Sequence, residues 1–209
     1  MPLIDEAVNA INKELEVKNG ARDRALISSR TITRYAANAI RALHRGERDI
    51  ASESLGAGRA MAEETRRELA QHPELYWSGY VQDSQKELAE AYFVTAFIEG
   101  ERVPSADDIG VENVPYLNGM AEAASEMRRY VLDTIRRGSA DAIRDAERIL
   151  GLMDEVYSAL ITVDFPDALT GGLRRTTDAL RAVLERTRGD LTLTIRQSQL
   201  EQALREYKV

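Results

Sequence analysis

Apolar side chains recur three and four residues apart along most of the chain, which is the spacing of one face of an α-helix. No segment alternates apolar and polar residues as a half-buried strand would. We therefore predict an all-α fold, with seven helices packed as an antiparallel bundle. The predicted helices cover about residues 3–17, 22–45, 49–71, 74–98, 116–137, 140–162 and 173–206.

Local stop and start signals set the predicted boundaries. Asn19 and Gly20 predict the end of the first helix, and Pro73 after His72 closes the third. Ser139 is the expected N-cap of the sixth helix. Residues 102–113 form the best loop candidate, because proline, serine, aspartate and glycine gather there. The linkers are short and the composition does not shift, so residues 1–209 are predicted to form a single helical domain.

The charge and the cysteine count narrow the function classes. The formal net charge is −7, and the chain has no cysteine, which excludes disulfides, thiolate nucleophiles and zinc–thiolate sites. No stretch of uncharged apolar residues approaches the length of a membrane-spanning helix, and the first residues do not form a signal-peptide core. We expect a cytoplasmic protein that does not enter a membrane.

Against this acidic background, an arginine stripe lies on one predicted helical face. Its members recur at whole-turn spacings of an α-helix: Arg30, Arg34, Arg41, Arg45 and Arg48. Guanidinium groups bind phosphates through paired hydrogen bonds, so the stripe favours a nucleic-acid partner. The alternative is a solvated or ion-paired face, in which Glu47, Asp49 and Glu53 pair with the stripe at subunit contacts.

Four glutamates form a second candidate constellation. Glu87 and Glu90 are three residues apart on one predicted helix, and Glu122 and Glu126 are four apart on the next. If these helices pack antiparallel, the four carboxylates can converge on Mg²⁺ or Mn²⁺, which could activate a water and stabilise a phosphoryl transition state. With 35 acidic residues in the chain, such pairs also arise by chance.

Other chemistry has little support in the sequence. The two histidines, His44 and His72, belong to no Glu-x-x-His pair, which disfavours a di-iron bundle. Ser/His/Asp catalysis would have to use one of these histidines, and neither has a Gly-x-Ser-x-Gly context.

Four segments in the same order resemble the translin family, which contains translin and translin-associated factor X (Trax). Residues 29–33 read Ser-Arg-Thr-Ile-Thr, and residues 40–45 read Ile-Arg-Ala-Leu-His-Arg. Residues 87–91 read Glu-Leu-Ala-Glu-Ala, followed by Phe-Ile at 97–98. Residues 116–122 read Tyr-Leu-Asn-Gly-Met-Ala-Glu, and residues 173–180 read Leu-Arg-Arg-Thr-Thr-Asp-Ala-Leu. Together the segments cover about residues 24–184.

The resemblance implies a seven-helix bundle of the translin type that assembles as a homo-oligomer, expected to be an octamer. It also implies binding of single-stranded RNA and DNA. The acids of the Trax branch, which bind Mg²⁺ and cut RNA, correspond to Glu87, Glu90, Glu122 and Glu126. Arg30 and Arg45 match family positions, whereas Arg34 and Arg41 rest on the helical face alone.

Two departures from the Trax pattern are visible. The third acidic position is usually Asp in Trax and is Glu122 here, and the loop at residues 102–114 is shorter. We expect a Mg²⁺-dependent endoribonuclease. The alternatives are a non-catalytic single-strand binder, as translin is, and a structural helical oligomer without nucleic acid. A translin-like partner chain is compatible with each of these.

Overall fold

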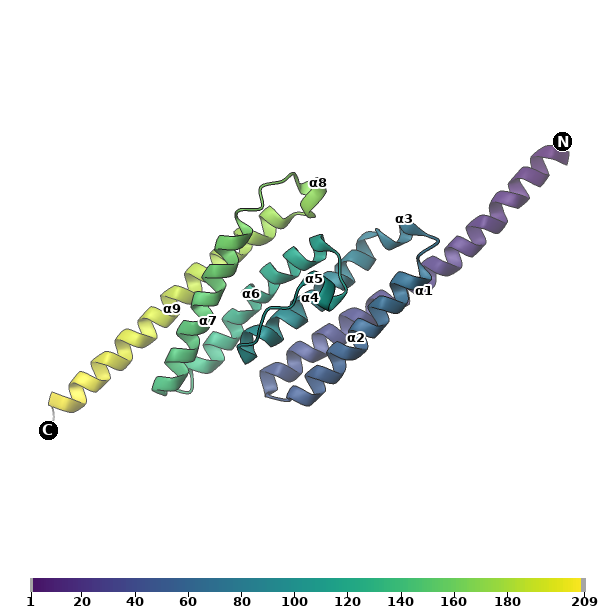
Figure 1. The fold of residues 1–209 in the computed structure, drawn as a ribbon. Helices are drawn as coiled ribbons and strands as arrows, with labels where there is room; N and C mark the ends of the chain where they lie inside the picture. The colour runs from purple at the N-terminus through teal and green to yellow at the C-terminus, as the bar shows by residue number, and fades with distance from the viewer. Residues whose placement is uncertain (1, 208–209) are drawn as a thin grey trace. The chain divides into compact units, whose positions relative to one another are not determined.

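The computed structural model describes residues 2–207, and within that range it contains helices and connecting loops but no strand (Figure 1). The all-α prediction is therefore confirmed. The helices of the described range are α1 (Pro2–Arg45), α2 (Arg48–Glu68), α3 (Pro73–Tyr76), α4 (Gly79–Glu99), α5 (Ala106–Ile109), α6 (Asn113–Ile135), α7 (Ala140–Leu160), α8 (Asp167–Thr170) and α9 (Leu173–Tyr207). Six of them are long, and α3, α5 and α8 have four residues each. None of the helices in this range is long and apolar enough to cross a membrane.

The chain divides into two compact units. The first comprises the residues up to Ala89 together with Ser105–Pro115, and the second comprises Glu90–Pro104 and the residues from Tyr116 onward. The boundary falls inside α4, whose helix continues through it. The interpretation of residues 1–209 as one domain stays a prediction.

Helix α1 runs without interruption from Pro2 to Arg45, so the predicted stop at Asn19 and Gly20 is wrong. Gly20 keeps a negative φ, whereas Gly46, which does end the helix, has a φ of 77°. The reason lies in the following turn. Ala21 and Ala25 are buried in a cluster with Leu69, Leu75 and Val81. Burial of this face offsets the roughly 1 kcal/mol that a glycine costs inside a helix.

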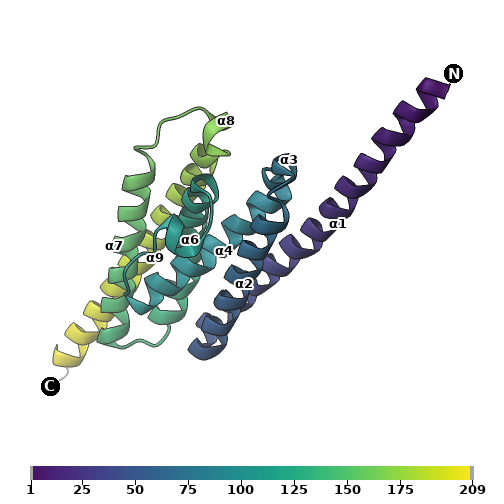
Figure 2. The same cartoon turned by 45° about the vertical axis from the view of Figure 1, so that its right-hand side comes forward.

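The second half of α1 and the whole of α2 form a helical hairpin in the first unit (Figures 1 and 2). After Gly46, the amide of Glu47 donates to the carbonyl of Ala42 at 2.9 Å, which satisfies the end of α1. The buried positions of both helices follow the alternating spacing of four and three residues: Ile32, Ala36, Ala39 and Leu43 on α1, and Ala51, Leu55, Gly58, Ala62 and Thr65 on α2. Their small side chains allow the two backbones to approach closely.

Gly58 marks the tightest point of this packing, and it gives a test of the fold. A Cβ atom at Gly58 would lie 3.0 Å from Leu88 Cδ1 and 3.4 Å from Tyr35 Cβ, whereas one at Gly56 would meet nothing within 4 Å. We expect Gly58→Leu to lower the free energy of unfolding by about 1–3 kcal/mol through overpacking. Gly56→Leu, on the exposed face of the same helix, should leave stability unchanged or raise it. Chemical denaturation measures the free energy of unfolding of the two variants. Equal values for both would contradict this packing.

Short elements that the sequence pattern did not reveal join the long helices. The predicted helix 74–98 is broken at Trp77 and Ser78 into α3 and α4. The predicted loop contains α5, where the Ser105 hydroxyl accepts from the amide of Asp108 at 3.1 Å and the Asp108 carboxylate accepts from the amide of Ser105 at 2.9 Å. This reciprocal capping gives a four-residue helix a defined start.

In the second unit, α7 and α9 lie side by side. Both bury residues at a four-three spacing, from Ala142 to Leu160 on α7 and from Leu173 to Leu191 on α9. The predicted cap of α7 is confirmed, because the Ser139 hydroxyl accepts from the amide of Ala142 at 3.1 Å.

Candidate functional site

Helix α4 carries Glu87 and Glu90 one turn apart, and both side chains are half-buried. The neighbouring positions Leu88, Ala89 and Ala91 are buried, so apolar packing fixes this stretch of the helix. At the far end of α4, the Arg148 guanidinium donates to the carbonyl of Phe97 at 3.0 Å, which ties the helix C-terminus to α7. The two carboxylates are thus held by packed backbone and not by a mobile loop.

Helix α6 carries Glu122 and Glu126, and polar contacts fix it against α8 and α9. Arg128 donates to Asp190 at 2.7 Å and to Thr187 at 3.3 Å. The buried Asn118 donates to the carbonyl of Thr170 at 2.9 Å. These contacts fix the rotation of α6 about its axis and therefore the direction of its glutamate face.

Three of the four predicted glutamates come together. One carboxylate oxygen from each of Glu87, Glu90 and Glu122 lies within 4.8 Å of the others. Two oxygens on opposite sides of a Mg²⁺ ion are about 4.2 Å apart, because each lies about 2.1 Å from it. Adjacent ligands of an octahedral ion are closer, about 3.0 Å apart, so the upper limit of 4.8 Å in this group is near the ligand spacing of one ion. Lys86 Nζ lies 3.6 Å from Glu87 Oε1 and adds a positive charge beside the group.

The fourth glutamate, Glu126, is not part of this close group. Its Oε1 atom lies 3.9 Å from Arg129 Nη1, one turn further along α6. An ion pair at this distance between half-exposed groups is weak. Participation of Glu126 would therefore require a change of rotamer, and the assignment of all four acids as metal ligands stays a prediction.

A groove on α6 beside Glu126 was missed by the sequence analysis. It has a volume of about 600 Å³ and is lined by Ser125, Glu126, Arg128, Arg129, Leu132, Asp133 and Arg136. Arg129 continues the helical face of Glu122 and Glu126, because it follows Glu122 by nearly two whole turns, whereas Arg136 lies just beyond the end of α6 at Ile135. The spacing of these residues is present in the sequence, whereas the groove itself depends on how the side chains pack in the fold.

The arginine stripe exists on α1, but it has four members and not five. Arg30, Arg34, Arg41 and Arg45 are exposed on one face of α1. Arg48 begins α2 beyond the turn at Gly46, so its predicted place in the stripe is wrong. The spacing argument for Arg48 assumed a continuous helix, whereas α1 ends at Arg45.

The four arginines differ in their partners. Arg45 Nη2 lies 2.5 Å from Glu47 Oε2; this pairing raises the pKa of Arg45 and lowers that of Glu47, chiefly through their hydrogen bond. Arg41 donates to Asn38 at 2.7 Å. In the described range, neither Arg30 nor Arg34 forms an ion pair. Their guanidinium groups are therefore open to an anion at no cost in broken ion pairs.

Within the described residues, the glutamate group on α4 and α6 and the arginine stripe on α1 are thus carried by an all-helical framework. No protein-family model matches the chain. Among solved structures, it is similar to AfC3PO in complex with duplex RNA, with a TM-score of 0.83 and 30% identity over 91% of this chain and 97% of that chain. A second structure of AfC3PO gives a TM-score of 0.82 and 30% identity over 91% of this chain and 98% of that chain.

Two further similarities, at lower identity, cover most of the chain. Apo-NeC3PO has a TM-score of 0.80 and 18% identity, over 90% of this chain and 96% of that chain, and so shares the fold. An uncharacterized protein of Methanocaldococcus jannaschii is 27% identical over 208 residues, which are 98% of this chain and 90% of the relative. On the similarity to AfC3PO, the chain belongs to the translin/C3PO family.

Proposed function

We propose that this protein is a Mg²⁺-dependent or Mn²⁺-dependent endoribonuclease of the Trax branch that works as a homo-oligomer, with an octamer expected from the family resemblance. The observation that carries the proposal is the approach of Glu87, Glu90 and Glu122 to within 4.8 Å of one another. Three half-buried carboxylates at this distance repel one another in the absence of a cation. A divalent ion with a preference for oxygen ligands relieves that repulsion.

The residues present fit such an ion. Glu87, Glu90 and Glu122 would hold it, and Glu126 would join after leaving Arg129. When bound, the ion would supply charge stabilisation at the scissile phosphate and would lower the pKa of a water molecule. The two histidines of the chain lie on other elements, His44 in α1 and His72 at the start of α3, so a glutamate of the group is the expected proton acceptor.

The arginines would hold the RNA backbone. Arg30 and Arg34 are exposed without an ion pair in the described range, and Arg41 and Arg45 would add contacts after exchanging their present partners. Arg129 of α6 and Arg136, just beyond the end of that helix, line the groove that contains Glu126. Arginine contacts to phosphate give affinity without base specificity. We therefore expect binding of RNA and DNA with little sequence preference.

A non-catalytic nucleic-acid binder is the second candidate. Two observations favour it: Glu122 stands where Trax usually has Asp, and Glu126 lies outside the close carboxylate group. The related AfC3PO was solved in complex with duplex RNA, and this supports nucleic-acid binding under either candidate function. Duplex RNA is therefore a second RNA substrate to test beside single-stranded RNA.

A labelled-oligonucleotide assay separates the candidates. Single-stranded RNA, duplex RNA and single-stranded DNA are incubated with purified protein in Mg²⁺, in Mn²⁺ and in chelator. We expect RNA cleavage with either metal and none with chelator. Tight, salt-sensitive binding without cleavage would favour the second candidate. Absence of binding to all three oligonucleotides at low salt would reject both and leave a structural helical assembly.

A further inference from the structure

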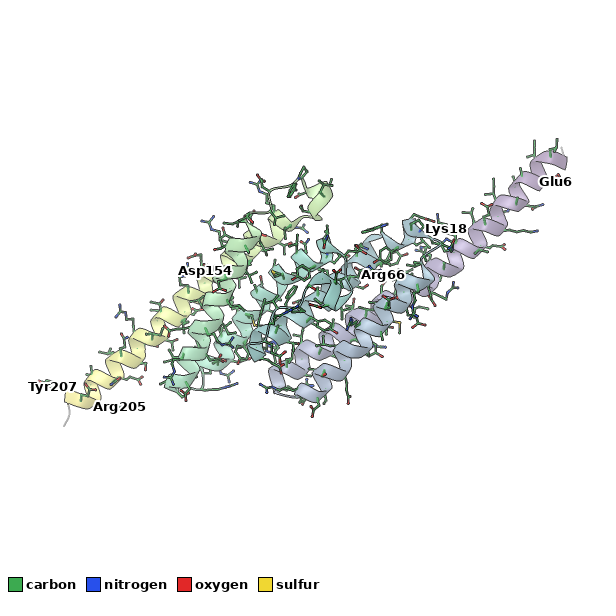
Figure 3. The ribbon with its side chains drawn as sticks, in the orientation of Figure 1. Glu6, Lys18, Arg66, Asp154, Arg205 and Tyr207 are labelled. Atoms are coloured by element: carbon green, nitrogen blue, oxygen red, sulfur yellow. The ribbon has the colours of Figure 1, made fainter. Side chains whose placement is uncertain are left out.

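The first part of α1 carries exposed apolar residues that the proposed function does not use. Leu3, Ile4, Val8, Ile11, Leu15 and Val17 have between 50% and 79% of their surface exposed. Single exposed apolar residues are ordinary on protein surfaces, but six of them close together on one helix are not. Figures 1 and 2 show this part of α1 extending beyond α2 and α3 of its own unit, and Figure 3 labels Glu6 and Lys18 near its two ends.

Four of these residues have the spacing of a helix–helix seam. Ile4, Val8, Ile11 and Leu15 are separated by four, three and four residues, which is the a/d pattern of a coiled coil. The next position of the pattern is Lys18, whose Nζ lies 2.7 Å from Glu74 Oε1 of α3. The seam therefore begins at Ile4 and ends at Leu15, where α1 begins to pack on its own unit.

The spacing is symmetric about its centre, between Asn9 and Ala10. Read from either end, the intervals are four, three and four residues. We propose that this seam pairs with the same seam of a second copy of the chain, in antiparallel orientation about a two-fold axis. Ile4 then packs against the partner's Leu15, and Val8 packs against the partner's Ile11. Each contact is made twice, as a two-fold interface requires.

The polar residues beside the seam agree with this orientation. In an antiparallel pair the flanking e positions face each other and so do the g positions. Asp5 then lies opposite the partner's Asn12, and Glu14 opposite the partner's Ala7, so no two carboxylates meet. In a parallel pair the two Lys18 side chains and the two α3 segments would meet at the same end. The helix dipoles also favour the antiparallel arrangement.

A membrane surface fits this seam less well than a second copy of the chain does. The polar positions between Asp5 and Lys18 include four acidic residues and two lysines, whereas helices that bind lipid surfaces usually carry a lysine-rich and arginine-rich polar face. The self-pairing proposal does not depend on whether the glutamates bind a metal ion, and its failure would leave the nuclease proposal untouched.

Cysteine cross-linking tests the pairing, since the chain has no cysteine of its own. Full-length Ile4→Cys and Leu15→Cys variants with different affinity tags are mixed by co-expression and oxidised mildly. A disulfide needs Cα atoms within about 7 Å. We expect a mixed cross-link between the two variants. Ile4→Cys alone should give none, because two Ile4 residues would lie about 16 Å apart along the antiparallel pair.

Three results would overturn the proposal. Self-cross-linking of Ile4→Cys without the mixed product would mean a parallel pair. A cross-link between Ile4→Cys and Leu204→Cys would assign the seam to the exposed end of α9. Absence of any cross-link would mean that no second copy covers this face.

A charge introduced into the seam gives an independent measurement. Ile11→Glu should lower the mass in light scattering after size-exclusion chromatography, while the helix content by circular dichroism is retained. Ile27→Glu is the matched control, because Ile27 is exposed on the opposite face of the same helix. An unchanged mass for Ile11→Glu would contradict the pairing, as would an equal loss of mass in both variants.

Discussion

Replacing two glutamates of the candidate metal centre, in the variant Glu87→Gln plus Glu90→Gln, is expected to abolish Mg²⁺-dependent RNA cleavage. The amides keep the shape of the side chains but remove two anionic ligands from the close carboxylate group. A catalytic metal ion contributes several kcal/mol of transition-state stabilisation, and each loss of about 1.4 kcal/mol slows the reaction tenfold. Cleavage should therefore fall about a thousandfold or more, as measured with a labelled oligonucleotide.

Binding and stability distinguish loss of the metal from loss of the fold. RNA binding in chelator should persist or tighten, since two negative charges are gone. Mg²⁺ should raise the melting temperature of the parent protein and not that of the variant. A ligand stabilises the folded state only when it binds to that state, and the variant has lost two of the ligands for the ion. Asp83→Asn plus Glu101→Gln removes two exposed carboxylates and should cleave normally. Undiminished cleavage by the purified Glu87/Glu90 variant would remove the metal assignment.

The second large effect is expected from Arg30→Ala plus Arg34→Ala. These exposed guanidinium groups form no ion pair in the described part of the chain, so their removal breaks no ion pair of the fold. If both bind phosphate, the affinity for single-stranded RNA at low salt should fall at least about tenfold. The slope of log affinity against log salt should flatten by about 1.4, since each phosphate contact on a single strand contributes about 0.7.

Arg22→Ala plus Arg24→Ala is the matched control for the stripe. It removes the same charge from the same helix, but Arg22 is paired with Asp23 at 3.3 Å and Arg24 with Glu68 at 3.9 Å. We expect this variant to keep most of the salt dependence of the parent protein. Parallel salt plots for the parent and the Arg30/Arg34 variant would mean that the stripe does not contact nucleic acid.

Helical periodicity was sufficient to predict the long helices, because each buries a continuous face over several turns. Local signals were less dependable where tertiary packing competes with them. Gly20 looked like a helix end, yet burial of Ala21 and Ala25 carries α1 through it. Conversely, nothing in the apolar pattern between residues 74 and 98 marks the break at Trp77 and Ser78.

The sequence was sufficient to predict which residues belong to the candidate site, but not the side-chain conformations that bring them together. Spacing placed Glu87 with Glu90 and Glu122 with Glu126 on common faces, and the first three do come together. Glu126 lies outside this group and 3.9 Å from Arg129, and the spacing of the acids alone does not indicate this. Arg48 was misplaced for a related reason: an angular argument holds only as far as the helix continues, and α1 ends at Arg45.

Because α1 is continuous, it fixes the distance between the apolar seam near its N-terminus and the arginine stripe near its C-terminus. With Gly20 inside it, the seam that ends at Leu15 and the stripe that begins at Arg30 belong to one rod, about 22 Å apart along the axis at about 1.5 Å per residue. Their relative direction is fixed as well. Removing one residue between them would turn the arginines by about 100° relative to the seam, whereas removing seven would turn them by only about 20°. The segment from Glu16 to Ser29 therefore constrains function through its length, even where its individual side chains touch nothing.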